Sequence, residues 1–365
     1  MKTEIKIIRS EKSWIESSAI EQLIKVAELE GVVQAVGMPD LHPGKTPVGA
    51  SFVTNNIVYP HLIGNDIGCG MTLFSTAVNK KKFKTSKIIE KLKKLDSLES
   101  INIDDLRDET EYTFKNKLGT IGGGNHFAEF QEINEIYNEK AMKDMNLEKD
   151  KIMLLVHSGS RSFGEFILRK FIDEYSCQNG LKTDSEAFQA YMKDHNEAIN
   201  FAKLNRELVA YRLMQYLKMN NYFEVINSQH NSLTVKKVNG ENLYIHRKGA
   251  APADEGYVVV AGSRGSNSYI VEPIGEPKDF AYSIAHGAGR KWSRFSCKER
   301  LEGLYSKKDI RLNNLNYSVI CKDKNLIYQE APEAYKNIER VIEDMVEANM
   351  IKLVASFKPL ITYKV

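Results

Sequence analysis

The order of strand-like and helix-like segments constrains the fold of this chain more than any other feature of its sequence. Apolar residues recur at helical spacing in residues 12–30, 84–97, 165–176, 184–219 and 332–355. Shorter apolar runs typical of strands lie at Val32–Val36, Ala50–Thr54, Met71–Ser75, Ile152–Val156, Leu233–Val238, Tyr257–Ala261 and Tyr269–Val271. The two kinds of segment do not alternate regularly, as they would in a doubly wound sheet or a βα barrel. The pattern therefore predicts an α+β fold in which residues 1–365 form one large mixed domain.

Composition and cysteine spacing indicate a soluble protein of a reducing compartment. The chain has 365 residues, of which 42% are hydrophobic and 27% charged, and this balance is typical of a globular protein. No apolar run approaches the roughly 18 residues that a membrane span needs, and the charged N-terminal residues do not resemble a signal peptide. The cysteines are scattered and form no CxxC pair, which makes a disulfide framework an unfavourable interpretation. We therefore expect a cytoplasmic protein without a membrane partner.

Glycine, serine and asparagine gather in short strings beside the strand-like runs. These strings are GNDIGCG (64–70), GTIGGGNHFAE (119–129), VHSGSRSFG (156–164), NSQHNS (227–232), AGSRGSNSY (261–269) and AHGAGRKWSR (285–294). Loops that follow strands commonly carry functional side chains, and glycine there allows the backbone to approach a ligand closely. The strings therefore mark the candidate site.

The first group of candidates is a set of possible metal ligands: Asp66, Cys69, His126, His157 and His230. Taken singly, such a cysteine is more often a small buried residue, and such a histidine a hydrogen-bonded core residue. Together, thiolate, carboxylate and imidazole groups form a set that suits Zn²⁺, Mn²⁺, Fe²⁺ or Co²⁺. Five donors exceed the need of one tetrahedral ion, so the set favours a site for two metal ions.

Two strings combine hydroxyl groups, glycine and arginine in a way that suits phosphate. His157–Arg161 has this composition, and Ala261–Arg264 repeats it with Ser266 and Ser268 close behind. Neither string is a Walker A loop, because the chain contains no GxxxxGK[ST] sequence. Gly119–Gly124 also lacks the strand, helix and acidic residue that a dinucleotide-binding loop requires.

His286 lies among small residues that would leave its imidazole accessible. Arg290 and Arg294 follow it closely, so the histidine could attack a phosphorus atom while the arginines neutralise phosphate charge. The alternative is an ordinary loop histidine.

A separate basic stretch, Lys80 to Lys94, precedes an acidic stretch from Asp96 to Glu111. A solvated helix and loop is the favoured interpretation of these stretches, and a phosphate-contacting edge is the alternative.

The strings, taken in order, resemble the RtcB family of RNA ligases. The resemblance spans nearly the whole chain and also includes MPDLHPGKTPVGA (38–50), HN (230–231), HRKGA (246–250) and a lysine near the C-terminus. It implies that Asp66, Cys69, His126, His157 and His230 hold two Mn²⁺ ions, with Cys69 as the bridge. It implies that His286 attacks the α-phosphate of GTP and becomes guanylylated, and that Arg161 and Arg294 face RNA phosphates. The implied GTP contacts are Asn125, His126, Phe127, Ala128, Glu129, His230, Asn231, Ala261, Gly262, Ser263, Arg264, Ser268, His286, Gly287, Ala288, Gly289 and Lys364.

The resemblance implies an RtcB-type fold, with helices flanking irregular sheets around a central metal and nucleotide cleft. It also implies an enzyme that joins RNA 3′-phosphate or 2′,3′-cyclic phosphate ends to 5′-hydroxyl ends. Departures from the family pattern lie near the expected substrate rim, for example Ser162, Arg264 and AAPAD after HRKG. These departures and the compact length resemble the branch found with release factor H-type proteins, which implies repair of a cleaved structured RNA. The alternatives are a metal-dependent cyclic phosphodiesterase or hydrolase of RNA ends, and a non-catalytic RNA- or ribosome-binding relative.

Overall fold

The computed structural model describes residues 3–102, 114–302 and 317–364. Part of the acidic stretch from Asp96 to Glu111 therefore lies outside the described residues. The α-helices in the described part are α1 (Ser17–Ala27), α2 (Thr85–Lys94), α4 (Glu139–Asp144), α5 (Ser162–Tyr175), α6 (Glu186–Leu217), α7 (Arg294–Glu302), α9 (Lys324–Gln329) and α10 (Ile338–Glu347). Short 3₁₀ turns lie at Pro60–Leu62, Leu98–Ser100, Lys115–Lys117, Cys177–Asn179, Pro277–Phe280 and Pro332–Ala334.

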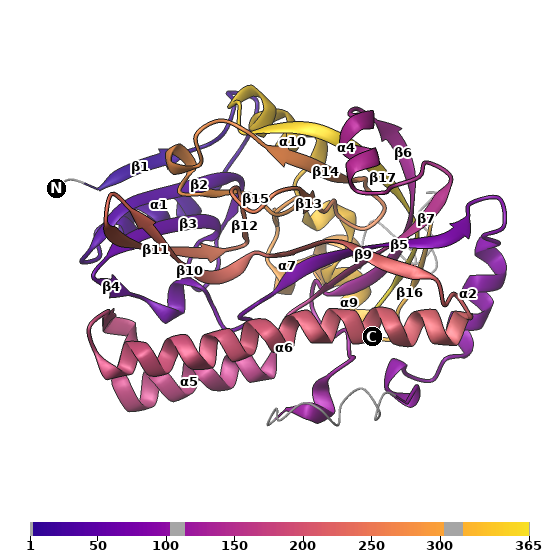
Figure 1. Ribbon diagram of the computed structural model, residues 1–365, viewed down its shortest axis with the longest axis horizontal. Coiled ribbons are helices and arrows are strands. Elements are labelled where there is room, and N and C mark those ends of the chain that lie inside the picture. The colour runs from indigo at the N-terminus through magenta and orange to yellow at the C-terminus, as the bar shows by residue number, and fades with distance from the viewer. Residues whose placement is uncertain (1–2, 103–113, 303–316, 365) are drawn as a thin grey trace.

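The larger sheet runs through the centre of the molecule (Figure 1). It contains β5 (Gly70–Asn79), β6 (Phe127–Ile136), β7 (Lys151–Ser158), β9 (Tyr222–Gln229), β13 (Val258–Val260), β14 (Ser268–Pro273), β16 (Ser318–Ile320) and β17 (Ile351–Tyr363). Its order is β13-β14-β17-β6-β7-β5-β9, and β16 pairs with β17. Every pair along the main path is antiparallel, so neighbouring strands begin and end at opposite edges.

A second sheet and two small ribbons complete the β-structure of the described residues. The second sheet has the order β1-β2-β3-β11-β10 and contains β1 (Glu4–Ile7), β2 (Val32–His42), β3 (Val48–Asn55), β10 (Asn231–Val238) and β11 (Glu241–Lys248). The ribbons pair β12 (Ala250–Pro252) with β15 (Ser283–Ala285), and β4 (Ile57–Val58) with β8 (Leu181–Lys182). Because β9 of one sheet leads through His230 into β10 of the other, that residue lies where the two sheets meet.

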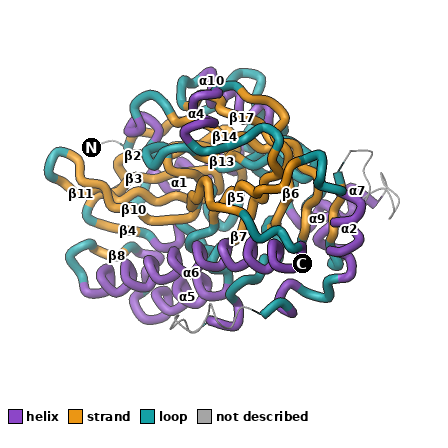
Figure 2. The backbone as a smooth tube through the Cα atoms, turned by 45° about the vertical axis from the view of Figure 1, so that its right-hand side comes forward, coloured by secondary structure: helices purple, strands orange, loops and turns teal. Residues whose placement is uncertain are grey.

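Helix α6 supports the large sheet from one side, with α5 lying alongside it (Figures 1 and 2). The helix begins at a cap in which the Ser185 hydroxyl accepts a hydrogen bond from the amide of Phe188. Its buried face, which includes Val209 and Leu213, joins the apolar core formed by Leu154 and Val156 of β7. This helix therefore fixes the strands whose ends form the site described below.

The α+β class is confirmed, and most expected segments lie at observed elements. The predicted helices at 12–30, 84–97, 165–176 and 184–219 overlap α1, α2, α5 and α6. Each predicted strand overlaps an observed one, although β2 and β5 extend several residues beyond the predicted ends. The predicted helix at 332–355 is wrong in its second half. Helix α10 ends at Glu347, Asn349 takes the left-handed φ of 54°, and β17 follows as a buried central strand. No helix in the described part of the chain is long and apolar enough to cross a membrane.

Two buried histidines outside the site should make the fold sensitive to acid. Burial lowers the pKa of His246 to about 3 and that of His195 to about 4. Each neutral ring accepts a backbone hydrogen bond at Nε2, from the amide of Tyr59 at 2.9 Å and from that of Leu233 at 3.0 Å. In the unfolded chain these rings take up protons near pH 6.5, so their contribution to stability is present above that pH and falls as the pH decreases toward 4.

We expect each of these histidines to cost about 2 kcal/mol of stability between pH 7 and pH 5, at about 1.4 kcal/mol per pH unit below 6.5. Urea unfolding at the two pH values measures the loss. His246→Gln keeps an acceptor for the Tyr59 amide but does not titrate, so its stability should fall by about 2 kcal/mol less than that of the wild type. An equal fall in both proteins would contradict the assignment to His246.

Candidate active site

Four antiparallel strands bring four of the five expected metal ligands to one edge of the large sheet. Cys69 directly precedes β5 and His126 directly precedes β6, whereas His157 lies at the end of β7 and His230 directly follows β9. The strand order β6-β7-β5-β9 alternates beginnings and ends, and the register pairs Phe127 with His157 and Gly70 with Gln229. Since paired strands lie about 4.8 Å apart, residues distant in sequence become neighbours.

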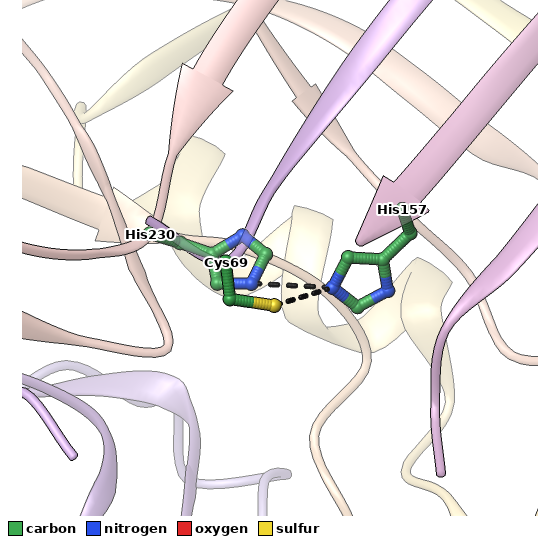
Figure 3. A group of neighbouring side chains, drawn as sticks. All are labelled: Cys69, His157 and His230. Carbon is green, nitrogen blue, oxygen red and sulfur yellow. Dashed lines mark hydrogen bonds between the residues drawn. The ribbon is translucent and has the colours of Figure 1, made fainter. Parts of the chain in front are cut away.

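The first cluster consists of Cys69, His157 and His230, all of them buried (Figure 3). The Nε2 atom of His157 lies 3.3 Å from the Cys69 sulfur and 3.3 Å from Nε2 of His230. One ring nitrogen of each histidine and the sulfur therefore point toward a common position. The Nδ1 atom of His157 lies 3.2 Å from the carbonyl oxygen of Asn125, which leaves Nε2 free to act as a ligand.

The second cluster consists of Asp66, Cys69 and His126 and shares the cysteine with the first. Nε2 of His126 lies 2.9 Å from Oδ2 of Asp66 and 3.4 Å from the Cys69 sulfur. A thiolate can contact two cations, so the shared sulfur suits a pair of metal ions better than a single one. Cys69 and His126 are buried and Asp66 is partly exposed. Their sulfur, nitrogen and oxygen donors form a chemical set that fits a divalent transition metal.

Burial sets the protonation of these ligands in the metal-free protein. It lowers the pKa values of His157 and His230 well below their usual value, so both rings are neutral at pH 7 and can donate a lone pair. Burial and the nearby Asp66 carboxylate raise the pKa of the Cys69 thiol. Burial opposes ionisation of Asp66, but the His126 imidazole and the Arg161 amide lower its pKa overall. A metal ion entering this site would therefore displace the thiol proton.

A strained turn holds the Asp66 carboxylate in place. Arg161 has φ of 51° and ψ of −117°, a conformation that residues with a side chain rarely adopt, and its amide donates to Oδ1 of Asp66 at 2.6 Å. Gly159 precedes it, and a Cβ atom there would lie 2.3 Å from the same oxygen. The HSGSR string thus holds Asp66 with its backbone, a role that composition alone did not indicate.

His286 lies beside the first cluster and contacts a buried carboxylate. Its ring centroid is 4.5 Å from that of His230, and its Nδ1 atom is 2.7 Å from Oδ2 of Asp40, whose side chain is inaccessible to solvent. Asp40 belongs to β2, so the second sheet supplies the group that orients the histidine. Because Nδ1 faces the carboxylate, Nε2 is the ring atom left for chemistry.

The clusters and His286 line one cavity of about 780 Å³. The expected GTP-contacting residues also line it, with the exceptions of Ala128 and Ser268, which are buried behind its wall. At the β6–β17 end of the cavity, Glu129 accepts hydrogen bonds from Gln131 at 2.8 Å and from Thr362 at 2.5 Å. Burial raises the pKa of Glu129 to about 7 and lowers that of the nearby Lys364.

The two arginines expected to face RNA phosphates both line this cavity. Arg294 is partly exposed and lies 3.4 Å from the buried carboxylate of Glu330, which also contacts Arg290 at 3.3 Å. The Arg161 guanidinium donates to the carbonyl oxygen of Lys117 at 2.6 Å. Both arginines are therefore anchored on one side while they face the cavity.

Comparison with known proteins assigns this chain to a family. The family described as tRNA-splicing ligase RtcB matches residues 22–99 and 80–365. This chain belongs to the RtcB family. It is similar to RNA-splicing ligase RtcB2 of a strain of Escherichia coli, with 41% identity over 98% of this chain and 94% of that protein. It also resembles tRNA-splicing ligase RtcB of Nanoarchaeum equitans, at 28% identity over 99% and 93%, and RNA-splicing ligase RtcB of Escherichia coli strain K12, at 28% over 96% and 95%.

Membership of the RtcB family makes the protein an RNA ligase, and its site contains groups that the strings did not reveal. Asp40 and Glu330 are buried carboxylates that contact His286 and the arginine pair, respectively. Asp40 lies within the strand that also carries His42. A charged side chain is unfavourable inside a buried strand unless it has a partner, and this is the pattern that could have identified Asp40. No comparable pattern surrounds Glu330.

A fully buried arginine of α6 supports the two loops that carry the shared cysteine and His157. Arg206 donates to the carbonyl oxygens of Gly68 and Ser158, each at 2.9 Å, and to the side chains of Thr72 and Asn227. Gly68 precedes Cys69 and Ser158 follows His157 in the sequence. This one guanidinium therefore sets the spacing between the ligands of the first cluster.

We expect Arg206→Met to lower the free energy of unfolding by about 3 kcal/mol or more, because it leaves several buried acceptors without donors. It should also weaken Mn²⁺ binding by about tenfold to a hundredfold, the usual effect of losing support behind a ligand. Calorimetric titration with Mn²⁺, at a temperature where the variant stays folded, measures the second effect. Arg212→Met is the matched control, since Arg212 is equally buried on α6 but donates to the carbonyl oxygens of Leu118 and Gly119. Equal Mn²⁺ affinity in both variants would contradict the role of Arg206.

Proposed function

We propose that the protein is a GTP- and Mn²⁺-dependent RNA ligase that joins 3′-phosphate or 2′,3′-cyclic phosphate ends to 5′-hydroxyl ends. The observation that carries this proposal is the placement of His286, which contacts Asp40 at 2.7 Å and lies beside the cysteine–histidine cluster. A hydrolase of RNA ends would need no such nucleophile. A non-catalytic relative would not be expected to keep both ligand clusters and the oriented histidine.

The residues that would hold two metal ions are Cys69, His157 and His230 for one ion, and Asp66, Cys69 and His126 for the other. When bound, such ions neutralise phosphate charge and polarise the phosphorus–oxygen bonds. Manganese is proposed from the family resemblance, because this donor set would bind several divalent metals and the Irving–Williams order does not favour Mn²⁺.

His286 is the proposed nucleophile of the first step. Asp40 contacts Nδ1, which leaves the Nε2 lone pair to form a bond to the α-phosphorus of GTP while the bond to the pyrophosphate oxygen breaks. The RNA 3′-phosphate then displaces the imidazole and takes the GMP group. Finally the 5′-hydroxyl attacks the activated phosphorus, loses its proton and releases GMP. A cyclic phosphate end would first need hydrolysis to the 3′-phosphate.

The Glu129 end of the cavity is the proposed guanine site. A carboxylate can accept hydrogen bonds from N1–H and the 2-amino group of guanine, and the Lys364 ammonium can donate to O6. Adenine presents an acceptor at its N1 atom and a donor at its 6-amino group, so it would leave both buried groups badly paired. The bonds from Gln131 and Thr362 hold the Glu129 carboxylate in one orientation. We therefore infer selection of GTP over ATP.

The side chain of Arg161 is proposed to bind an RNA phosphate, whereas only its backbone supports the metal site. Its amide orients Asp66, whereas its guanidinium faces the cavity. Arg161→Ala keeps the backbone hydrogen bond, so we expect RNA joining to fall at least about tenfold while self-guanylylation changes less. The measurement compares both rates in the same preparation. Equal losses would place Arg161 in the nucleotide site instead.

Repair of a cleaved structured RNA is the proposed biological role, with a functional link to a release factor H-type protein. Its support is the compact chain and the variant residues near the cavity, such as Ser162 and Arg264.

The guanylylation chemistry itself can be tested directly. Protein incubated with Mn²⁺ and α-³²P-GTP should acquire an acid-labile label that α-³²P-ATP does not give. Metal-loaded protein that takes no label would contradict the proposed mechanism.

A further inference from the structure

Helix α2 and the turn before it form a surface with an unusual concentration of positive charge. The exposed lysines of this lysine surface are Lys80, Lys81, Lys82, Lys84, Lys87, Lys91, Lys93 and Lys94. Glu90 is the one acidic residue within residues 80–94. Since the whole chain has a formal charge of +3, the rest of the chain is net acidic. The positive charge is therefore strongly localised.

Ion pairing within the fold does not account for this lysine surface. Ile88 and Leu92 pack into the core, and the lysines occupy the remaining faces of the helix. None of the eight ammonium groups pairs with a carboxylate in the part of the chain that the structure describes. Lys87 and Lys91 are four positions apart on one helix face, where like charges repel, and the first turn contains no acidic residue. Such a surface would be stabilised by an external polyanion.

The turn that precedes α2, from Lys80 to Lys84, lies far from the metal ligands at the other end of β5. Cys69 precedes one end of β5 and Lys80 follows the other, so the ten-residue strand separates them by about 30 Å. Figure 1 shows α2 at the margin of the molecule, beyond the far ends of β5 and β7. A nucleic acid joined at the metal ligands could therefore reach the lysines of this turn only with a part remote from its break.

We infer that the lysine surface binds the phosphate backbone of the RNA substrate, away from the ends that are joined. This inference rests on the proposed ligation of RNA, and it names structured RNA as the preferred substrate. Neutralising a lysine that contacts a phosphate makes the dependence of log K on log salt less steep, by about 0.7 per contact for single strands and about 0.9 for duplex DNA. Short RNAs confined to the cavity should not depend on these residues.

The experiment measures RNA binding by fluorescence anisotropy at several salt concentrations. The test variant is Lys80→Gln/Lys81→Gln/Lys82→Gln/Lys84→Gln. The matched control changes four exposed lysines elsewhere, at Lys12, Lys25, Lys193 and Lys237, and has the same net charge. One probe is a hairpin of about 40 nucleotides with a break that ends in unreactive 3′- and 5′-hydroxyl groups. The other is a pair of trinucleotides with the same ends, which is too short to span about 30 Å.

We expect the test variant to bind the hairpin at least about tenfold more weakly at 0.1 M salt, with a salt slope reduced by about 2 or more, and to bind the trinucleotides normally. The control variant should retain both affinities within about threefold. Equal weakening by both variants, or equal weakening for both probes, would overturn the inference. Unchanged hairpin binding would also overturn it, because the lysines would then serve a partner other than RNA. Self-guanylylation, measured in parallel, reports separately on the proposed function.

Discussion

Replacement of His286 should abolish covalent attachment of GMP and leave the protein folded. The imidazole contacts Asp40 through Nδ1, which leaves Nε2 for chemistry. The other cavity histidine beside a carboxylate, His126, belongs to the second ligand cluster. We expect His286→Ala to reduce labelling by α-³²P-GTP to background, which for a nucleophile corresponds to a loss of at least about 10⁴-fold. RNA joining should disappear with it.

His286→Gln separates this chemical role from a structural one. The alanine variant leaves the buried Asp40 carboxylate without its partner, which costs stability, whereas a glutamine amide can still donate toward it. Both variants should lack the label, but the glutamine variant should melt close to the wild type. His61→Ala is a suitable control because His61 is a partly buried histidine that does not line the cavity. Label retained in either His286 variant would remove this residue from the nucleophile role.

Sequence patterns identified the candidate ligands but could not show how they meet. Cys69, His126, His157 and His230 lie beside four different strands, and only the order β6-β7-β5-β9 brings those strand ends to one edge. Strand order in an antiparallel sheet depends on long-range pairing that local patterns do not encode. The family resemblance implied Cys69 as the bridge, but how the other ligands divide between two clusters became visible only with the geometry.

Local patterns failed where tertiary contacts decide the structure. The apolar residues after Glu347 fit a helix as well as a strand, but Asn349 turns the chain and β17 pairs with both β6 and β14. Asp40 was missed because the predicted strand ended at Val36, whereas β2 continues to His42 and carries Asp40 to its partner. Here that partner is His286, which is almost 250 positions later in the sequence. The role of the buried Arg206 could not be predicted for the same reason, because its hydrogen-bond partners are distant in the sequence.

Loss of the Cys69 thiol should empty both proposed metal positions together. The sulfur belongs to both clusters, with contacts of 3.3 Å to His157 and 3.4 Å to His126. We expect Cys69→Ala to weaken binding of both Mn²⁺ ions by at least about a hundredfold, which is roughly the share of one ligand in a protein metal site. Calorimetric titration, or electron paramagnetic resonance of free Mn²⁺, measures both occupancies.

The single-cluster variants make the bridging role testable. His230→Ala removes a ligand from one cluster only, and so does His126→Ala from the other. Each should therefore lose one Mn²⁺ ion and retain the second, whereas Cys69→Ala loses both. Cys177→Ala provides the control for removing a buried thiol, because Cys177 packs in an apolar cluster without candidate ligands around it. If Cys69→Ala kept one tightly bound ion, the thiol would serve a single metal.

The pH dependence of metal binding tests the role of the Cys69 sulfur independently. Burial and Asp66 raise the pKa of the Cys69 thiol, so the metal-free protein at neutral pH carries a proton that the ion must displace. Mn²⁺ affinity should accordingly rise with pH, by up to about tenfold per unit while the thiol remains protonated, and binding should release about one proton. His157 and His230 are already neutral and contribute little to this slope near pH 7. Calorimetry in two buffers of different ionisation enthalpy counts the proton, and a wild-type protein that released none would bind its metals without the thiolate.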